Sequence, residues 1–286
     1  MTYYNINGKI VPKSEAFVHV SDLSLHRGYS IFDYFCVREG MPLFIEDYLD
    51  RFEASAEMML LKLPIDRVEI KKRIDNLIAL NEVKEAGIKL MLTGGDSEDG
   101  FTPAAEANLY ILVLPPITFP EEIVQHGMRL LLHEHTRYIP NIKMTNYVEV
   151  LRQRKQLQEK GMHDLLFHQN GVVSESSRSN FFIVTPQGQL VTSSDDILYG
   201  VTRKQLLKIA PNHYEVEIRN IKVEEVKDAQ EAFICSSAKG TIGIVQVDDW
   251  KIGDGRVGAV TRRLNSLYEE KISKYLAMNL RNIHVP

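Results

Sequence analysis

The sequence predicts an α+β protein with two domains. Segments with strand and helix character are mixed along the chain, without the strict alternation that a doubly wound parallel sheet needs. The length of 286 residues is too great for one small core and suits two domains. Prolines stiffen the stretch from Pro115 to Pro120, and the sequence pattern changes across it. We therefore expect domains over residues 1–115 and 123–286, joined by a linker over 116–122.

The expected N-terminal domain opens with a β-hairpin. Asn7-Gly8 lies between two short strand-like runs, and both residue types accept the positive φ that a two-residue hairpin turn requires. Isoleucine and leucine residues then repeat at helical spacing and predict a helix that ends near Gly87. In chain order, the elements expected after the hairpin are a helix over 47–61, a helix through 70–78, and strands over 88–92 and 107–114.

The expected C-terminal domain also mixes strands and helices. Gly161 would end a long helix as its C-cap, and Pro211 would stop a shorter one. Apolar residues from Val260 to Leu276 recur on or near one face, which predicts a closing amphipathic helix. In chain order, the elements expected before that helix are a strand over 128–132, a helix over about 146–160, strands over 181–184 and 190–192, a helix over 202–210 and a strand over 232–235.

Composition and charge exclude several classes of protein. The net charge is −4, so no excess of basic residues favours nucleic acid. No apolar stretch approaches the length that crosses a bilayer, and the N-terminus lacks the basic and apolar layout of a signal peptide. Cys36 and Cys235 lie far apart in apolar runs, which favours buried free thiols over a disulfide. We expect a cytoplasmic protein that binds neither nucleic acid nor membrane.

Three runs supply, in chain order, an amine, a carboxylate and a helix start suited to an anion. Lys143 begins the run that ends at Tyr147, Glu175 follows in a Ser-rich segment, and Gly200-Val201-Thr202-Arg203 opens a helix. Pyridoxal 5'-phosphate requires this combination, because its aldehyde condenses with a lysine and its ring nitrogen binds an acidic partner. Its phosphate takes backbone N–H groups at a helix start. The three runs together indicate a pyridoxal-phosphate site.

Each of these residues also has a plain structural interpretation. Lys143 alone would be a solvated surface cation, and Glu175 alone would cap or solvate a turn. Thr202 would be an ordinary N-cap residue. Arg51, on the first expected helix, would add a bidentate phosphate contact or be an ordinary helix arginine. The functional interpretation therefore depends on the runs occurring together.

Two further patterns look like sites but have simpler explanations. Gly253-Asp254-Gly255-Arg256-Val257-Gly258 matches the glycine spacing of a dinucleotide fingerprint, yet too few residues follow it to complete a nucleotide-binding unit. We interpret it as a turn that leads into the last helix. His133-Glu134-His135 would place two imidazoles on one strand face, but no third ligand stands at a suitable spacing. We therefore expect no metal site.

Short motifs in a fixed order extend over nearly the whole chain. They are Val20-Ser21-Asp22, Arg27 to Asp33, Leu49 to Ser55, Lys143 to Tyr147, Gly171 with Glu175 and Asn180, Leu198 to Arg203, Phe233 to Ser237, and Gly253-Asp254-Gly255 with Gly258. Together they resemble the class IV (fold type IV) pyridoxal-phosphate aminotransferases. That group includes branched-chain aminotransferases, D-amino-acid aminotransferases and aminodeoxychorismate lyases. Each motif is modest, but their order and spacing together are specific.

The resemblance implies a fold and a set of residue roles. The fold would have a small N-terminal domain and a larger, barrel-like C-terminal domain that carries the lysine and most cofactor contacts, in a homodimer. Lys143 would hold the cofactor covalently and then shuttle a proton, while Glu175 would pair with the ring nitrogen. The other implied contacts are Arg51, Val201, Thr202, Ser237 and Ala238 at the phosphate, Tyr147 at the phenolic oxygen, and Phe32 and Tyr34 on the substrate side.

Three departures from the family pattern bear on the substrate. Tyr48 stands where a histidine often occurs, and Ser237-Ala238-Lys239 replaces a Gly-Thr-Ala loop of branched-chain enzymes. Gly94 stands where D-amino-acid enzymes have an arginine, so a carboxylate clamp of that kind is missing. The resemblance thus implies an aminotransferase for an amino acid and a 2-oxo acid, branched-chain-like by first preference. D-Amino-acid transamination, aminodeoxychorismate lyase activity and a non-catalytic cofactor-binding protein are the alternatives.

Overall fold

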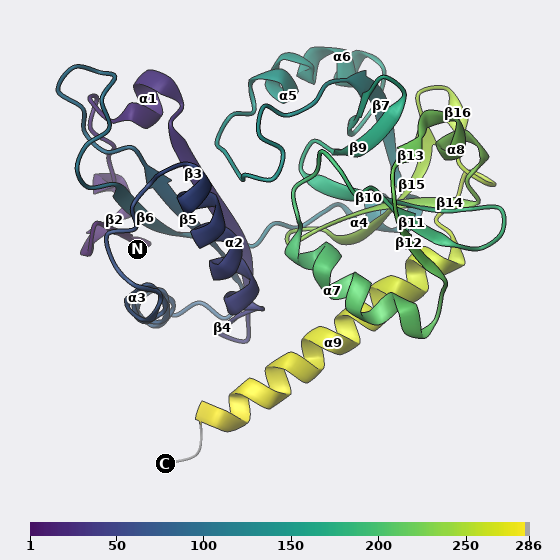
Figure 1. Ribbon diagram of the computed structural model, residues 1–286. Helices are drawn as coiled ribbons and strands as arrows, with labels where there is room; N and C mark the ends of the chain where they lie inside the picture. Colours follow the sequence, from purple (N-terminus) through teal and green to yellow (C-terminus); the bar gives the residue numbers. More distant parts are fainter. Residues whose placement is uncertain (284–286) are drawn as a thin grey trace. The chain divides into compact units, whose positions relative to one another are not determined.

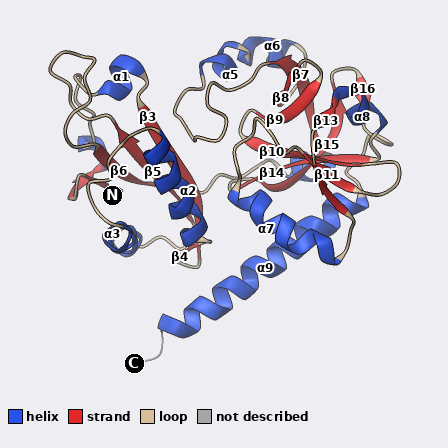
Figure 2. Cartoon of the chain, viewed as in Figure 1, coloured by secondary structure: helices blue, strands red, loops and turns tan. Residues whose placement is uncertain are grey.

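The computed structural model describes residues 1–283, which form two compact units with a sheet in each (Figure 1, Figure 2). Unit 1 comprises residues 1–117, the short segment Ile142–Asn146 and the end of the chain from Tyr275. Unit 2 comprises Thr118–Asn141 and Tyr147–Lys274. Helices and strands occur in both units, so the expected α+β class is confirmed.

The segment that carries Lys143 does not follow the domain division that we expected between residues 115 and 123. We expected this lysine in the C-terminal domain, but Ile142–Asn146 groups with unit 1. The reason is backbone pairing, because Ile31 of unit 1 forms an isolated antiparallel bridge with Met144. The linker over 116–122 stays a prediction.

Unit 1 is built on one antiparallel sheet with strand order β2-β1-β6-β5-β3-β4. Asn7 and Gly8 both have positive φ in the turn between β1 and β2, which confirms the expected hairpin. β3 was not expected as a strand, although it is the longest of the sheet. The strands are β1 (Tyr3–Ile6), β2 (Lys9–Pro12), β3 (Ser30–Arg38), β4 (Met41–Pro42), β5 (Ala86–Thr93) and β6 (Asn108–Leu114).

The helices of unit 1 are α1 (Leu23–Arg27), α2 (Ile45–Met58), α3 (Arg67–Leu80) and the 3-10 helix η1 (Lys13–Glu15). α2 packs on one face of β3, where Phe35 contacts the ring of Tyr48 at 5.3 Å between centroids. Because side chains alternate along a strand, Phe32 lies on the opposite face. α3 ends earlier than the expected Gly87, since the Asn81 amide donates to the Leu77 carbonyl oxygen (2.8 Å) and terminates the helix.

Unit 2 contains a sheet that closes on itself. The strand order is β12-β11-β10-β14-β15-β7-β8-β9-β13, and β9 also pairs with β10. That pairing joins two strands from the middle of the order, so β10, β14, β15, β7, β8 and β9 form a closed ring around an apolar core. The expected barrel-like domain is therefore confirmed. Phe181, Ile183 and Ile234 are among the fully buried members of its core.

The strands of unit 2 are β7 (Met128–Glu134), β8 (Asp164–Gln169), β9 (Val172–Ser176), β10 (Ser179–Val184), β11 (Leu190–Thr192), β12 (Val216–Ile218), β13 (Ile221–Lys222), β14 (Glu231–Ser236), β15 (Gly240–Val247) and β16 (Trp250–Lys251). Its helices are α4 (Glu121–His126), α5 (Val148–Arg152), α6 (Arg154–Glu159), α7 (Val201–Ile209), η2 (Ala210–Asn212), α8 (Val223–Asp228) and α9 (Ala259–Ile283), the last continuing into unit 1.

The helix expected over 146–160 is two helices, α5 and α6, which meet at Gln153. The side chain of Gln153 turns back to donate to Glu149 (2.7 Å). Little apolar surface is buried along this segment, where Leu157 is the one buried residue of the two helices, so packing does not enforce a straight helix. Within residues 1–283, no helix has the length and hydropathy to span a membrane.

Candidate functional site

Lys143 is held against the edge of β3 by backbone hydrogen bonds. The Phe32 N–H donates to the Lys143 carbonyl oxygen (2.9 Å), and the Thr145 N–H donates to the Ser30 carbonyl oxygen (3.4 Å). The hydroxyls of Ser30 and Thr145 add a contact of 2.6 Å. These bonds fix a loop lysine to a strand. A reactive group needs such support, because it must meet its partner at a defined position.

Two ammonium groups of unit 1 lie over the ring of Phe32. The Nζ atom of Lys143 is 4.7 Å from the ring centroid, and that of Lys89 is 4.8 Å away. Lys89 lies directly opposite Tyr34 in the β3–β5 ladder, on the same face as Phe32. Burial lowers the pKa of Lys89. No carboxylate within residues 1–283 pairs with Lys89, so a half-buried cation lies near the Phe32 ring without a carboxylate partner.

Arg51 projects from α2 and forms a forked ion pair with Asp33. Its Nε donates to one carboxylate oxygen of Asp33 (2.9 Å), and a terminal nitrogen donates to the other (2.6 Å). The Asp33 side chain is fully buried, and the guanidinium carbon lies 5.3 Å from the centroid of the Tyr48 ring. Tyr48, where the family resemblance led us to look for a histidine, thus contacts the arginine. The ion pair fixes the orientation of the guanidinium, and the phosphate role of Arg51 stays a prediction.

Tyr34, expected on the substrate side, has its hydroxyl buried. No group within residues 1–283 forms a hydrogen bond with this hydroxyl by ordinary geometry. Burial, followed by the nearby Cys36 thiol, raises the pKa of Tyr34. The ring lies over Gly87, where a side chain of any size would overlap it. The hydroxyl therefore stays neutral and is available as a donor.

Glu175, in β9, is a buried carboxylate with several donors around it. Arg137 contacts the same carboxylate oxygen through Nε (2.8 Å) and a terminal nitrogen (2.7 Å). The other oxygen accepts from the Leu198 N–H (3.0 Å) and lies 3.5 Å from the Asn180 amide nitrogen. Donors, a guanidinium among them, thus hold the carboxylate of Glu175 through both oxygens. Sequence patterns did not indicate Arg137, because its partner lies 38 residues away along the chain.

The start of α7 presents buried backbone donors. Gly200 is the N-cap residue, and Val201, Thr202 and Arg203 are almost fully buried. Within residues 1–283, no group accepts a hydrogen bond from the backbone N–H of these three residues. Buried N–H groups without an acceptor are costly, whereas an anion would satisfy them and would also interact favourably with the helix dipole. This helix start therefore fits a phosphate.

Asn180 connects this helix start to Glu175. It pairs with Glu175 in the β9–β10 ladder, and its amide donates to the Leu198 carbonyl oxygen (2.7 Å). A Cβ atom on Gly200 would overlap the Asn180 side chain, so glycine is required there. The carboxylate and the helix start are thus parts of one hydrogen-bonded arrangement in unit 2.

The remaining predicted residues of unit 2 lie in turns. Ser237 and Ala238 occupy the turn between β14 and β15, where the Lys239 N–H donates to the Ser236 carbonyl oxygen (3.1 Å). Tyr147 is the half-buried residue that precedes α5. Their cofactor contacts stay predictions.

The His133-Glu134-His135 run and the glycines from 253 to 258, which we interpreted as structural, have ordinary structural surroundings. His133 contacts Glu149 at 2.9 Å between Nε2 and a carboxylate oxygen. The glycines at 253 and 255 lie in the turn between β16 and α9, which confirms that interpretation.

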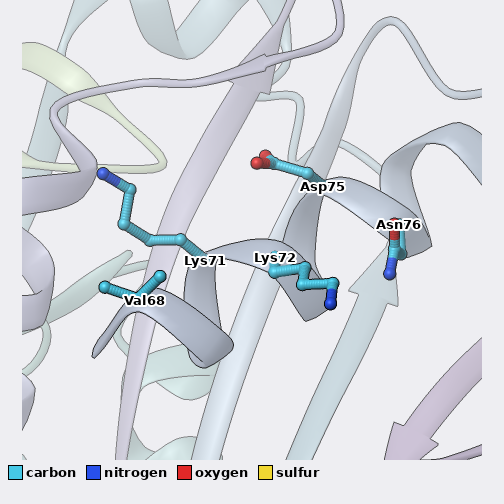
Figure 3. A pocket seen from close by; sticks show the side chains of 5 residues that line it. All are labelled: Val68, Lys71, Lys72, Asp75 and Asn76. Carbon is cyan, nitrogen blue, oxygen red and sulfur yellow. The ribbon is translucent and has the colours of Figure 1, made fainter. Parts of the chain in front are cut away.

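A surface pocket of about 290 Å³ lies along α3, away from all these residues in the sequence. Its described lining residues are Val68, Lys71, Lys72, Asp75 and Asn76, and the ammonium groups of Lys71 and Lys72 point in different directions (Figure 3). Lys71 already pairs with Glu46 at 2.5 Å. The two ammonium groups therefore do not converge on a common ligand position. None of the predicted site residues is among the described lining residues of this pocket.

The donor set of the described chain fits pyridoxal 5'-phosphate. Unit 1 supplies the amine of Lys143, held on a strand edge. Unit 2 supplies a buried carboxylate at Glu175 and buried N–H groups at the start of α7. An aldehyde, a ring nitrogen and a phosphate would each find the chemical partner that it requires.

Comparisons with known proteins agree with this donor set. The family model described as Amino-transferase class IV matches residues 30–247. A D-alanine aminotransferase of Bacillus licheniformis is 24% identical over 276 residues, which cover 93% of this chain and 95% of the relative. A branched-chain-amino-acid aminotransferase of Pseudomonas aeruginosa is 27% identical over 282 residues, which cover 93% of this chain and 92% of the relative.

Solved structures share the fold. The branched-chain amino acid aminotransferase of Escherichia coli superposes with a TM-score of 0.88 at 24% identity, covering 94% of both chains. The T.th. branched-chain enzyme with pyridoxamine 5'-phosphate has a TM-score of 0.88 at 25% identity, covering 95% of this chain and 94% of that one. Because the family match spans most of the sequence and includes the amine, the carboxylate and the helix start, the chain belongs to the class IV aminotransferases and is a pyridoxal-phosphate-dependent transaminase.

Proposed function

We propose that this transaminase takes its amino group from L-amino acids with branched or otherwise apolar side chains and transfers it to a 2-oxo acid. Gly94 carries the proposal. D-Amino-acid enzymes of the family have an arginine at this position, and here a Cβ atom would lie 2.5 Å from Cδ1 of Tyr29 and 3.1 Å from Cβ of Leu23. The surroundings leave no room for a larger side chain, so the D-type carboxylate clamp has no place. The branched-chain names of the Pseudomonas aeruginosa relative and of the T.th. structure support the same substrate class.

The face of the sheet around Phe32 suits an apolar amino acid with a carboxylate. Phe32 and Met91 are direct neighbours in the β3–β5 ladder and offer apolar surface. Lys89 supplies a cation whose charge no carboxylate within residues 1–283 neutralises. We assign Lys89 to the substrate carboxylate, because a half-buried cation gains most from an anionic partner.

The predicted catalytic and cofactor-binding residues then have roles in the transfer. Pyridoxal phosphate supplies the electron sink that lets the substrate Cα–H bond break. Lys143 would move the proton from the substrate Cα to the C4′ carbon of the cofactor, and Glu175, paired with Arg137, would hold the proton on the ring nitrogen. The backbone of Val201 and Thr202, the turn of Ser237 and Ala238, and the guanidinium of Arg51 would hold the phosphate. Tyr147 would donate to the phenolic oxygen.

We further propose a homodimer in the cytoplasm. Large apolar side chains are exposed in the first part of unit 1, where Phe17 is 75%, Val20 74% and Leu25 62% accessible. Such side chains would be covered by a second copy of the chain. Neither Cys36 nor Cys235 forms a disulfide, which suits a reducing compartment.

The test is a spectrum of the cofactor-loaded protein during addition of single amino donors. L-Leucine should convert the cofactor to its amine form within seconds to minutes, whereas D-alanine should leave the spectrum unchanged. Conversion by D-alanine alone would replace the proposal with D-amino-acid transamination. Release of pyruvate from aminodeoxychorismate, without amino transfer, would replace it with the lyase activity. A spectrum that responds to no donor would indicate a cofactor-binding protein without catalysis.

A further inference from the structure

Lys239 is a buried lysine in the turn that carries Ser237 and Ala238. Its side chain is 4% exposed. The ammonium lies 3.4 Å from a carboxylate oxygen of Asp164 and 3.1 Å from the Ser179 hydroxyl oxygen. Burial lowers the pKa of Lys239, and Asp164 opposes that effect. Most lysines lie on the surface, so a buried one at a turn requires an explanation.

Asp164, at the start of β8, is the anchor for this lysine. Its side chain is 2% exposed, and its second carboxylate oxygen accepts from the Leu165 N–H (2.9 Å) and from the Ser177 hydroxyl. A terminal nitrogen of Arg178, whose side chain is exposed, lies 3.9 Å from the carboxylate oxygen that Lys239 contacts. The carboxylate is therefore held from several sides, and Lys239 binds to a rigid point rather than to a mobile side chain.

The β14–β15 turn is restrained on both sides of Ser237-Ala238, by strand pairing on one side and by the ion pair on the other. On the N-terminal side, Cys235 is held in the sheet by its pairing with Asn180. On the C-terminal side, the Lys239 side chain reaches from the turn to Asp164 in β8 and Ser179 in β10. A two-residue segment between two fixed points has little freedom to move.

A buried ion pair rarely increases stability, because desolvation of both charges offsets their attraction. In some proteins such pairs are retained for the geometry that they specify, which is the role considered for this one. The geometry specified here is the position of Ser237 and Ala238 relative to the barrel. A hydrophobic residue at 239 would remove the contacts of this turn with Asp164 and Ser179.

We infer that Lys239 is a positioning residue that holds the Ser237-Ala238 turn where it can bind the cofactor phosphate. The inference rests on the proposed phosphate role of this turn. It assigns no contact between Lys239 and the cofactor. The expected effect is selective. Loss of Lys239 should weaken binding of the cofactor phosphate and leave binding of the cofactor ring unchanged.

Equilibrium dialysis with two ligands tests this selectivity. Pyridoxal 5'-phosphate and pyridoxal differ only in the phosphate, so each variant is measured with both. Lys239→Met should raise the dissociation constant for pyridoxal phosphate by roughly tenfold, the scale on which sites lose affinity when a supporting partner is removed. The constant for pyridoxal should change by less than about twofold. Lys251→Met, at an exposed lysine of β16, is the matched control and should change neither constant.

Two further variants separate positioning from folding. Lys239→Arg keeps the charge and should restore most of the affinity for pyridoxal phosphate. If Lys239→Met does not fold, the double variant Asp164→Asn with Lys239→Met removes both charges and should show the same selective loss. Unchanged affinity for pyridoxal phosphate, or equal losses for both ligands, would overturn the inference. A wild-type protein that binds both ligands equally would instead refute the phosphate site of the proposed function.

Discussion

Two helix starts in unit 2 share a sequence pattern and differ in the partners of their backbone N–H groups. Both α7 and α9 follow a glycine, Gly200 in one case and Gly258 in the other. At α9, the Glu231 carboxylate accepts from the N–H groups of Val260 and Thr261, each at 2.9 Å. At α7, no group within residues 1–283 accepts from the corresponding N–H groups.

The difference supports the anion site that we propose at α7. A glycine before a helix permits close approach, but an internal carboxylate can take the position of a bound anion. Glu231 does so at α9, and a Cβ atom on Gly258 would overlap its side chain. At α7 the residue next to the glycine is the neutral amide of Asn180, which leaves the donors for an external anion. The glycine fingerprint before α9 therefore marks a capped helix, and the weaker pattern before α7 marks the candidate site.

The largest contrast is expected from adding one methyl group at each glycine. Gly200→Ala should displace Asn180 and the start of α7, and raise the dissociation constant for pyridoxal phosphate at least ~100-fold, because several charge-assisted bonds of about 1.5–3 kcal/mol each are affected. Gly258→Ala should displace Glu231 and lower thermal stability while the dissociation constant stays near that of wild type. Equal losses of cofactor affinity in both variants would break the comparison.

Removal of a single backbone donor sharpens the comparison between the starts of α7 and α9. Val201→Pro eliminates one N–H at the first position of α7, where proline suits the helix and Gly200 already has the extended conformation that precedes proline. We expect cofactor affinity to fall ~10-fold, the scale of one charge-assisted hydrogen bond. The control is Ala259→Pro at the first position of α9, for which dialysis should give the wild-type constant. A Val201→Pro variant that binds as tightly as wild type would show that this donor is not used.

The converse test removes the internal anion. Glu231→Ala deprives α9 of its cap and should reduce the free energy of unfolding by ~1–2 kcal/mol, as other N-cap losses do. Urea unfolding of the cofactor-free protein measures this change. Cofactor affinity should not change, and a drop in affinity comparable with that of Val201→Pro would contradict the separation of the two helix starts.

The smallest effect is expected from inorganic phosphate. At a concentration equal to its dissociation constant, it should stabilise the cofactor-free wild type by about 0.4 kcal/mol through mass action. Val201→Pro should be stabilised less and Ala259→Pro as much as wild type, with chloride at equal ionic strength as the reference. Identical stabilisation of the two proline variants would indicate that phosphate acts elsewhere.

Much of the fold followed from local patterns. Asn7-Gly8 predicted its hairpin through turn chemistry, and the apolar spacing from Ile70 to Ile78 predicted the body of α3. The strand over 190–192 has the expected bounds. Lys143 and Glu175 were indicated because a cofactor with a fixed chemistry requires an amine and an acid in motifs of known order. Short-range periodicity and motif order are properties that a sequence displays directly.

The remaining features depend on contacts between distant residues. Arg137 meets Glu175 across 38 residues and Lys239 meets Asp164 across 75, and neither pair leaves a local signal. The position of Lys143 in unit 1 depends on a bridge between Ile31 and Met144 that no motif encodes. Whether a helix start is capped likewise depends on the partner strand, as Glu231 demonstrates.

The central claim is that Lys143 is the amine that holds the cofactor, and borohydride reduction tests it most directly. Reduction makes the covalent link permanent, so peptide mass spectrometry can locate it. We predict the mass of reduced pyridoxal phosphate on the peptide that contains Lys143, and its loss in Lys143→Ala. Attachment to Lys89, which lies over the same Phe32 ring, or to Lys239 would contradict the claim, as would a peptide map with no modified lysine.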